Sequence, residues 1–351
     1  MSWRWIALAL PLLTSRAIAQ QPQVVPPTDP AFLQGQLTDG PAAWPTDNGS
    51  ARNNNGFLTG NHDFPRFINF MSNVLESIDP RAVTAIYPIF GSFWTSSASP
   101  IPDGNFQLYG PAMTIALSDR LAVGLNDGGL VDAHFTKNPA DRLRILKDEI
   151  FFGSMSPRVA NRIDTQDFSG DRFGFVNLGG FVQYTVIADV ERQFLLTGGL
   201  RWEAPAGSHE VFQGYGPAHL APYFTAGKEF GEYHVLLTSG YQFPVGPGND
   251  TTQLFYANIH FDRRCFGWLY PLVEFNSIYH TTNVDFGLTT RRGFLDFGNF
   301  EATGNIVTVA AGANAVIVPE RLEVGAVYTT TIATERDFEA NGLWVKMTIR
   351  Y

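Results

Sequence analysis

The last nine residues, Leu343 to Tyr351, read LWVKMTIRY and alternate between apolar and polar side chains without interruption. Because the side chains of a strand point alternately to its two faces, one face would carry Leu343, Val345, Met347, Ile349 and Tyr351, and the other Trp344, Lys346, Thr348 and Arg350. This length and pattern are typical of the closing strand of a membrane-spanning β-barrel. We expect Met347, Ile349 and Tyr351 to form the C-terminal signal that the barrel-assembly machinery binds.

The two charges of this strand decide which face points outward. If the strand were turned over, Lys346 and Arg350 would enter lipid, at a cost of roughly 2 to 4 kcal/mol each near the bilayer midplane. The apolar face should therefore meet lipid, and the polar face should line the interior of a barrel.

The composition supports a mainly β protein and excludes a nucleic-acid partner. Aromatic residues make up 14% of the chain, charged residues only 16%, and the mean hydropathy is -0.05. These values suit many half-exposed strands better than a helical bundle. The formal net charge of -9 leaves no basic stripe that could neutralise phosphates.

The first residues predict an export signal. Arg4 supplies a positive charge, the stretch 5–13 an apolar core, and Ala17-Ile18-Ala19 a small-residue cleavage site. We expect a signal peptide over residues 1–19, cleaved near Ala19, and a flexible segment rich in Pro, Asn and Gln over residues 20–63. No later apolar run reaches the ~18 residues of a membrane helix, so insertion would be by strands.

The segment 64–80 is predicted to be short and either helical or irregular. Its apolar residues recur at roughly helical spacing, at Phe67, Phe70, Met71, Val74, Leu75 and Ile78. Asp79-Pro80 would end a helix there. Such a segment could plug or gate a lumen, but the interpretation we favour from the sequence is packing against the periplasmic rim of the barrel.

Strand-like runs then follow almost to the end of the chain. The twelve runs are Ala82 to Trp94, Asn105 to Leu117, Leu121 to His134, Phe173 to Ile187, Gln193 to Ala204, Ala218 to Phe230, Tyr233 to Val245, Thr252 to Asp262, Gly267 to Tyr279, Gly304 to Val318, Leu322 to Ile332 and Gly342 to Tyr351. Most exceed the ~5 to 6 residues of an ordinary strand and match the ~9 to 11 that a tilted membrane strand needs. The predicted fold is all-β: a transmembrane antiparallel up-and-down barrel of about 12 strands (10–14) over residues 81–351. Pro222 and Pro271 fall inside two of the runs and predict local breaks or bulges.

The connections alternate in length, as in outer-membrane barrels, which have short periplasmic turns and longer outside loops. The short ones are 118–120, 188–192, 231–232, 263–266 and 319–321, and the longer ones 95–104, 135–172, 205–217, 281–302 and 333–341. Both termini should therefore be periplasmic. The single Cys265 falls in a short turn, and the stretch 135–172 has room for a helix at 139–147 or a further strand at 149–153.

The polar faces of the runs supply the candidate lumen residues. These are Asn177, Gln183, Arg201, Glu203, Gln242, Asn258, His260, Glu274, Asn276, Lys346 and Arg350. Opposite charges at similar depth could form a constriction that selects permeants. The equally weighted alternative is a salt-bridged, filled interior, because twelve strands lie between the solid barrels of about eight and the open ones of sixteen or more.

Motifs of catalysis are not found in the sequence. It has no metal-ligand spacing, phosphate loop or nucleophile elbow, and neither Ser208-His209 nor His260 has a recognisable partner motif. We therefore expect a protein that is not an enzyme and has no cofactor or metal.

Several stretches resemble a known family. They are Asp79-Pro80-Arg81 with Tyr87-Pro88-Ile89-Phe90, then GNFQLYG at 104–110, LLTGGLRWEAP at 195–205, VFQG at 211–214 and YPLVEFN at 270–276. In these stretches the chain resembles bacterial outer-membrane barrels of the transporter-like superfamily associated with the MetA pathway of phenol degradation, planctomycete members above all. The resemblance implies a barrel in the bacterial outer membrane and passage of small, often hydrophobic or aromatic molecules, and it implies no catalytic residues.

The sequence thus predicts an outer-membrane channel through which a small-molecule permeant diffuses, with the lipid bilayer as its surroundings. Two alternatives stay open. One is a barrel that transports nothing and serves the envelope as a structural or surface-interaction protein. The other is a secreted soluble β-protein, in which the apolar faces of the strands would form an inner core.

Overall fold

The computed structural model describes residues 56–74, 76–95, 104–136, 170–211, 213–214, 217–246, 253–281, 305–335 and 340–351. The expectations for residues 1–55, and those for a helix or strand within 139–153, lie outside these ranges. Within them, no helix is long and apolar enough to cross a bilayer.

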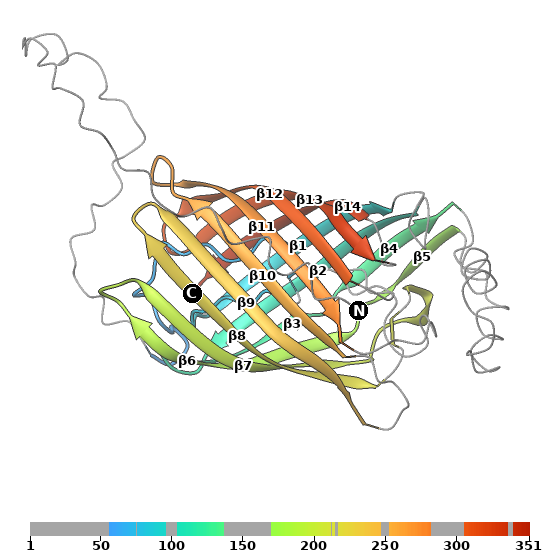
Figure 1. The fold of residues 1–351 in the computed structure, drawn as a ribbon, viewed down its shortest axis with the longest axis horizontal. Helices are drawn as coiled ribbons and strands as arrows, with labels where there is room; N and C mark the ends of the chain where they lie inside the picture. Colours follow the sequence, from blue (N-terminus) through green and yellow to red (C-terminus); the bar gives the residue numbers. More distant parts are fainter. Residues whose placement is uncertain are drawn as a thin grey trace, which may run out of the picture. The chain divides into compact units, whose positions relative to one another are not determined.

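The C-terminal strand closes the sheet into a barrel (Figure 1). β14 (Ala340–Arg350) pairs with β13 (Leu322–Glu335) on one side and with β1 (Ala85–Thr95) on the other. β1 also pairs with β2 (Gly104–Ala116), and these pairings are all antiparallel. No strand of the wall is therefore left with a free edge along its whole length, as the sequence predicts for an up-and-down barrel.

The remaining strands complete the wall in chain order. They are β3 (Leu121–Asp127), β4 (Leu130–Phe135), β5 (Gly170–Phe175), β6 (Leu178–Asp189), β7 (Phe194–Ala204), β8 (Ala218–Phe230), β9 (Tyr233–Val245), β10 (Leu254–Arg263), β11 (Leu269–His280) and β12 (Asn305–Val318). β3 and β4 both pair with β2 and follow one another along it, and β5 and β6 pair with β4 and β3 in the same way. The fourteen segments thus form twelve wall strands, the number predicted.

The interruption between β3 and β4 has a backbone cause. Gly128 and Gly129 separate the two segments with φ angles of +149° and +142°, which residues with a Cβ rarely adopt. A Cβ on Gly129 would also lie 2.4 Å from the carbonyl oxygen of Tyr109 on β2. Glycine lets the strand bend here while its backbone stays close to β2.

The two proline predictions have different outcomes. The β8–β9 ladder is interrupted at Pro222, between the pairs Leu220–Phe243 and Tyr223–Gly240, without a change of register. Pro271 instead pairs with Ala313 in an unbroken β11–β12 ladder. The missing amide of proline is therefore accommodated in the wall in both cases, and only Pro222 lies at a break in pairing.

The predicted faces of the strands are confirmed. On β14, Leu343 and Ile349 are exposed on the outside, whereas Trp344, Lys346 and Arg350 are buried inside. Large apolar side chains face outward on the other strands too, among them Leu200, Phe224, Phe255, Phe275 and Val324. The secreted soluble alternative is wrong, because it requires these faces to form an inner core.

The tight turns lie at one end of the barrel, together with both ends of the wall-forming chain. The amide of Tyr351 donates to the carbonyl of Thr84, just before β1, at 3.0 Å. At this end the turns include 231–232 and 319–321, and Cys265 lies in the β10–β11 turn as predicted. We call this the turn end and the opposite one the loop end.

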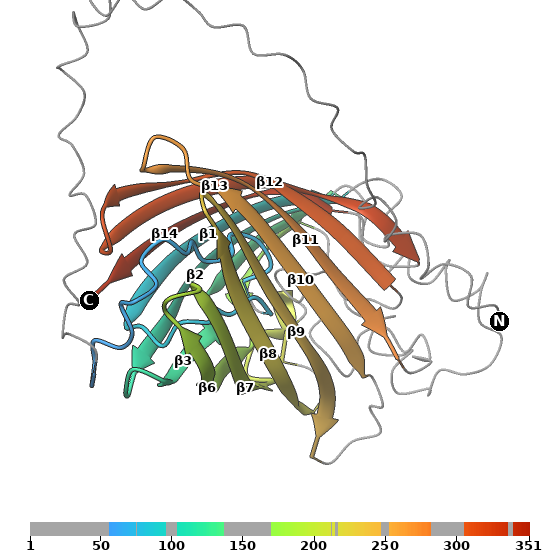
Figure 2. The same cartoon turned by 60° about the vertical axis from the view of Figure 1, so that its left-hand side comes forward.

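The segment before β1 is not a helix in its described part. Residues 64–74 and 76–80 form turns, bends and extended stretches. The segment runs between the walls of the barrel, where Figures 1 and 2 show it in blue. Phe67, Phe70 and Met71 are buried there against strands on different sides, and this arrangement produced an apolar spacing that resembles a helix.

Inside the wall, glycines make room for buried tyrosines. A Cβ on Gly240 of β9 would lie 2.4 Å from the hydroxyl of Tyr256, which is fully buried. We expect Gly240→Ala to lower the free energy of unfolding by about 1 to 3 kcal/mol through overpacking. Gly198→Ala is the matched control, because its Cβ would meet nothing closer than 4.0 Å. Urea titration of the refolded barrel measures both, and equal stabilities would contradict the packing assignment.

Candidate functional site

The lumen holds a hairpin of irregular chain, residues 61–82, which we call the plug. Its base is closed at the turn end, where the amide of Asn61 donates to the carbonyl of Ala82 at 2.7 Å. Just before the plug, the amide of Leu58 donates to the carbonyl of Ala116 at 2.9 Å. The plug therefore enters and leaves the barrel beside β2, and its contacts place it inside the wall and not against the rim.

The carboxylate of Glu274 holds the tip of the plug. The backbone amides of Met71 and Ser72 donate to its two oxygens, each at 2.7 Å, and the Ser72 hydroxyl donates to it as well. Glu274 lies in the middle of β11 and is fully buried. Charge-assisted hydrogen bonds of this kind are roughly twice as strong as neutral ones.

A row of alternating carboxylates and imidazoles continues from Glu274 along the wall. His260 lies between Glu274 (Nδ1, 2.7 Å) and Asp262 (Nε2, 2.9 Å), and Asp262 also contacts Nδ1 of His234 at 2.5 Å. Both ring nitrogens of His260 face carboxylate oxygens, and only a doubly protonated ring can donate from both. The row thus consists of alternating opposite charges that offset one another inside the barrel.

A second buried ion pair holds the plug nearer the loop end. The guanidinium of Arg201 on β7 contacts Glu76 of the plug and Glu203 of its own strand, both at 3.2 Å. The amide of Asn177 donates to the other oxygen of Glu203 at 2.8 Å. All these groups are buried, so their charges depend on one another for compensation.

The returning half of the plug offers backbone carbonyls to the wall. Gln183 of β6 donates to the carbonyls of Asp79 (3.0 Å) and Arg81 (3.1 Å), and Thr197 of β7 donates to that of Pro80 at 2.6 Å. Thr225 of β8 donates to the carbonyl of Ile78 at 3.0 Å. Irregular chain needs such partners, because it cannot pair its backbone with itself. Like Glu274, these side chains belong to the part of the wall that runs from β6 to β11.

An internal ion pair stiffens the plug before it leaves the lumen. Both oxygens of Asp79 accept hydrogen bonds from Arg81, with the closest contact at 2.7 Å. Burial alone would raise the pKa of Asp79, but the charge and hydrogen bonds of Arg81 lower it overall. The carboxylate form is therefore built into the folded plug.

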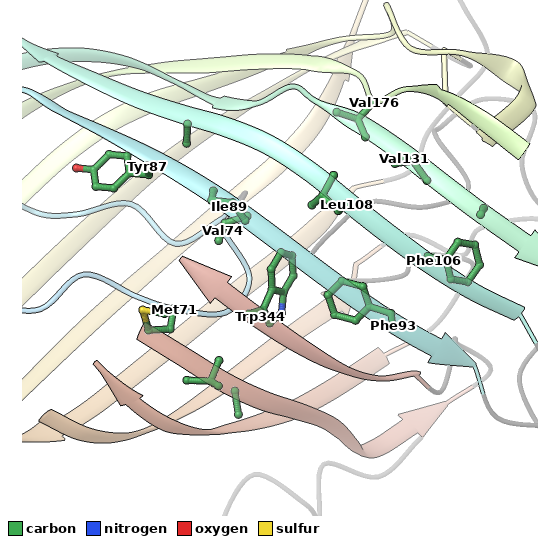
Figure 3. Close-up of a cluster of buried hydrophobic side chains, with 14 of the residues drawn as sticks. Met71, Val74, Tyr87, Ile89, Phe93, Phe106, Leu108, Val131, Val176 and Trp344 are labelled. Atoms are coloured by element: carbon green, nitrogen blue, oxygen red, sulfur yellow. The ribbon is translucent and has the colours of Figure 1, made fainter. Parts of the chain in front are cut away.

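The opposite face of the lumen carries a large apolar cluster. Side chains of β14, β1, β2 and β4 form a cluster with the plug residues Met71 and Val74 (Figure 3). Its labelled wall members are Tyr87, Ile89, Phe93, Phe106, Leu108, Val131, Val176 and Trp344. The rings of Phe93 and Trp344 meet edge to face with centroids 4.7 Å apart. The plug is thus hydrogen-bonded on one side and in apolar contact on the other.

Small cavities lie on this apolar side. One of about 30 Å³ is lined by plug residues, by Tyr87 and by Lys346. Another of about 10 Å³ lies between Val74, Leu108 and Gly128, beside the interruption of the wall. A cavity needs roughly 10 to 15 Å³ to hold one water, so neither could admit a larger solute while the plug stays in this position.

All eleven candidate lumen residues named from the sequence are buried. Gln183, Arg201, Asn258, Glu274 and Asn276 hydrogen-bond to the plug, and His260, Glu203 and Asn177 support those that do. Lys346 and Arg350 lie on other strands, where Arg350 pairs with Glu323. Within the described residues, no cluster of His, Cys or carboxylate side chains has the geometry to hold a metal.

The list of candidate lumen residues leaves out the partners on the plug and part of the charged row. His234 and Asp262 lie on polar strand faces that the sequence places in the lumen, and Glu323 follows the same alternation, so this signal could have added all three. Glu76 and Ser72 carry no such signal, because the plug has no regular period.

Several solved outer-membrane barrels are similar to this chain in structure. The COG4313 outer membrane channel from Pseudomonas putida F1 is 10% identical over 79% of this chain and 98% of that chain, with a TM-score of 0.50. The NanC porin is 6% identical over 75% of this chain and 100% of that chain, with a TM-score of 0.43. The CymD monoaromatic hydrocarbon channel is 8% identical over 85% of this chain and 97% of that chain, with a TM-score of 0.40. At 10% identity the likeness to the COG4313 channel shows the fold alone. No family model matches the sequence, and no curated protein matches it.

Replacing Arg201 tests how much the second ion pair contributes to the free energy of unfolding. Arg201→Met leaves Glu76 and Glu203 buried without their cation, and we expect a loss of about 3 to 5 kcal/mol in the free energy of unfolding. The control is Arg192→Met, which breaks the Arg192–Asp189 pair of a surface turn, where Arg192 is 82% exposed. That change should cost about 0 to 1 kcal/mol. Similar losses for both variants would contradict the role of the buried pair.

Acid should loosen the plug through Asp79. Its pKa is lowered from the unfolded value of 3.8, so its contribution to stability is present above that value and is lost as the pH falls through the lower, folded one. We expect the stability of the wild type to fall more steeply below about pH 4 than that of Asp79→Asn. Asp119→Asn, in an exposed tight turn, should keep the wild-type slope. Unfolding titrations between pH 7 and pH 2 test this, and parallel curves for all three proteins would refute it.

Proposed function

We propose that this protein is an outer-membrane channel for small solutes, closed in the described state by the plug and opened when the plug shifts. The observation that carries the proposal is the two-sided lumen. One side binds the plug through directional polar contacts, and the other offers mainly apolar contact and small cavities. A channel of the same fold, the COG4313 outer membrane channel, supports this assignment.

The outer surface supports a place in the membrane. Aromatic side chains are exposed near the turn end at Phe230, Tyr233, Phe266, Trp268 and Tyr351, and near the loop end at Trp94, Trp202, Tyr279 and Tyr328. Aliphatic and further aromatic residues such as Leu200 and Phe275 lie between them. Two aromatic girdles around an apolar band are typical of barrels in the outer membrane, where we place this chain, exported and cleaved near Ala19.

The apolar face indicates the class of solute. A path between the plug and the β1–β2 wall would be lined by Ile89, Phe93, Phe106 and Leu108. Such a lining gives little compensation for the lost hydration of an ion, but it suits a small hydrophobic or aromatic molecule. We therefore place permeation on this side and assign the eleven polar lumen residues mainly to holding the plug, with Lys346 and Arg350 nearest the path. The resemblance to the MetA-associated family agrees with such a permeant and stays a prediction.

The C-terminal strand has a second role in this proposal. Ile349 and Tyr351 are exposed on the outside of β14, and Met347 lies on the same face. They are accessible before the barrel closes on β1, as a signal for the assembly machinery must be.

A structural barrel is the second candidate, and the filled lumen favours it. Glu274 and Arg201 of the wall bind the plug through buried charged contacts, and Asp79 pairs with Arg81 within the plug. A barrel held in this way could serve the envelope without transporting anything. The two functions differ in whether the plug must move.

Tethering the plug distinguishes them. In a Cys265→Ala background, Val74→Cys with Ile89→Cys puts thiols on the plug and on β1, at two positions that belong to one apolar cluster and line the same cavities. We expect the reduced protein to show conductance steps in planar bilayers, and oxidation or a short thiol cross-linker to suppress them until reductant is added.

The matched control joins two wall strands and leaves the plug free. Thr330→Cys with Asn341→Cys links β13 to β14, where these side chains hydrogen-bond at 2.5 Å. Its conductance should not depend on the cross-link. A folded barrel that is silent in every state would overturn the channel and leave the structural role.

A further inference from the structure

The larger cavity separates the plug from the wall opposite its hydrogen bonds. The plug contributes Asn69, Val74, Ser77, Ile78 and Asp79, and the wall contributes Tyr87, Thr114, Asn126 and Lys346 together with apolar side chains of β1, β2, β3 and β6. The space is about 30 Å³, enough for roughly two water-sized occupants. Groups from both the fixed wall and the inserted segment therefore meet at one small site.

Lys346 reaches this cavity as a cation without a counter-ion. It is only 4% exposed, and its ammonium lies 5.7 Å from the centre of the Tyr87 ring. Among the described residues, no carboxylate lies within ion-pair distance of it. An uncompensated buried charge is strongly unfavourable, and contact with an aromatic face offsets only a part of this cost.

The three carboxylates whose charges act on Lys346 are bound to other groups. Asp79 accepts from Arg81, Glu323 from Arg350 and Asn314, and Glu274 from His260 and the plug amides. Arg350 is the other cation near Lys346, and it is paired with Glu323. None of these three carboxylates therefore forms an ion pair with Lys346.

Two polar atoms on the plug side also have no partner. The hydroxyl oxygen of Ser77 and the amide oxygen of Asn69 are buried without a hydrogen bond, and each residue is 7% exposed. Buried polar atoms are nearly always paired in folded proteins, with ordered water or a bound ion where no protein group serves. Both atoms belong to residues that line the same cavity as Lys346.

We propose that this cavity binds a chloride-sized monovalent anion between Lys346 and Ser77, together with one water that donates to Asn69. The anion supplies the missing charge and accepts hydrogen bonds from the ammonium and from the Ser77 hydroxyl. Water alone would satisfy the hydrogen bonds of Ser77 and Asn69, but it would leave the positive charge of Lys346 without compensation. Sulfate and gluconate are too large for the site.

The bound anion joins the wall to the plug on the side where direct hydrogen bonds are few. Small anions should therefore stabilise the described position of the plug, whether or not the barrel conducts. The site is independent of the proposed permeant and of the channel activity itself.

Bromide is the direct probe. Crystals of the refolded mature barrel grown in bromide should show an anomalous peak in the cavity beside Lys346, and Lys346→Gln should lack it. Lys228→Gln, which removes a cation from the turn end of β8, should keep the peak. No peak in the wild type, or an equal peak in Lys346→Gln, would overturn the proposal.

Thermal unfolding at pH 6.5 gives a second readout. The wild type should unfold several degrees higher in sodium chloride or bromide than in sodium gluconate of equal ionic strength, and Lys228→Gln should show the same shift. Ser77→Ala, which leaves the charge in place, should need several-fold more chloride for half the shift, and it serves also if Lys346→Gln does not fold. Equal unfolding temperatures in chloride and gluconate would overturn the site.

Discussion

The pairing of β14 with β1 is the constraint on which the rest of the structure depends. A strand edge in a bilayer would leave backbone amides and carbonyls without partners, so a membrane-spanning sheet has to close. Closure at twelve strands sets an interior that wall side chains alone fill poorly. The plug, residues 61–82, fills this space. Because it is irregular, its backbone amides and carbonyls then need hydrogen-bond partners. Gln183, Thr197 and Thr225 supply them from the inner face of the wall.

The same need explains why the polar side of the lumen is charged as well as polar. Glu274 accepts from two adjacent plug amides, and a carboxylate buried in this way needs compensation. His260 provides it, Asp262 compensates His260, and His234 follows. Each member compensates the charge of its neighbour, which would otherwise be buried without a partner. The row is thus best understood as one unit that fixes where the tip of the plug lies.

Most of the wall could be predicted from the sequence, and most of the plug could not. Alternation is a local property, and it correctly placed Lys346 inside and Leu343 outside β14. It also identified the polar side chains that bind the plug. The hydrogen bonds between the plug and the wall join residues more than a hundred positions apart, such as Met71 and Glu274, and no local period encodes them. The spacing of Phe67, Phe70 and Met71 resembles a helix only because an irregular chain surrounded by walls buries side chains in several directions.

The asymmetry of the lumen also determines how the plug can move. Hydrogen bonds to Glu274 and Gln183 are directional and short, so any displacement across them breaks several buried contacts together. Contacts with Ile89 and Leu108 are non-directional and can slide or part, at a cost that rises gradually with the area exposed. A plug under load will therefore separate first from the β1–β2 wall while it stays attached to β6–β11. The cavities already lie along this apolar boundary, beside Lys346 and Gly128. A path opened there would border apolar wall on one side and the plug on the other, and the charged row would remain buried behind the plug.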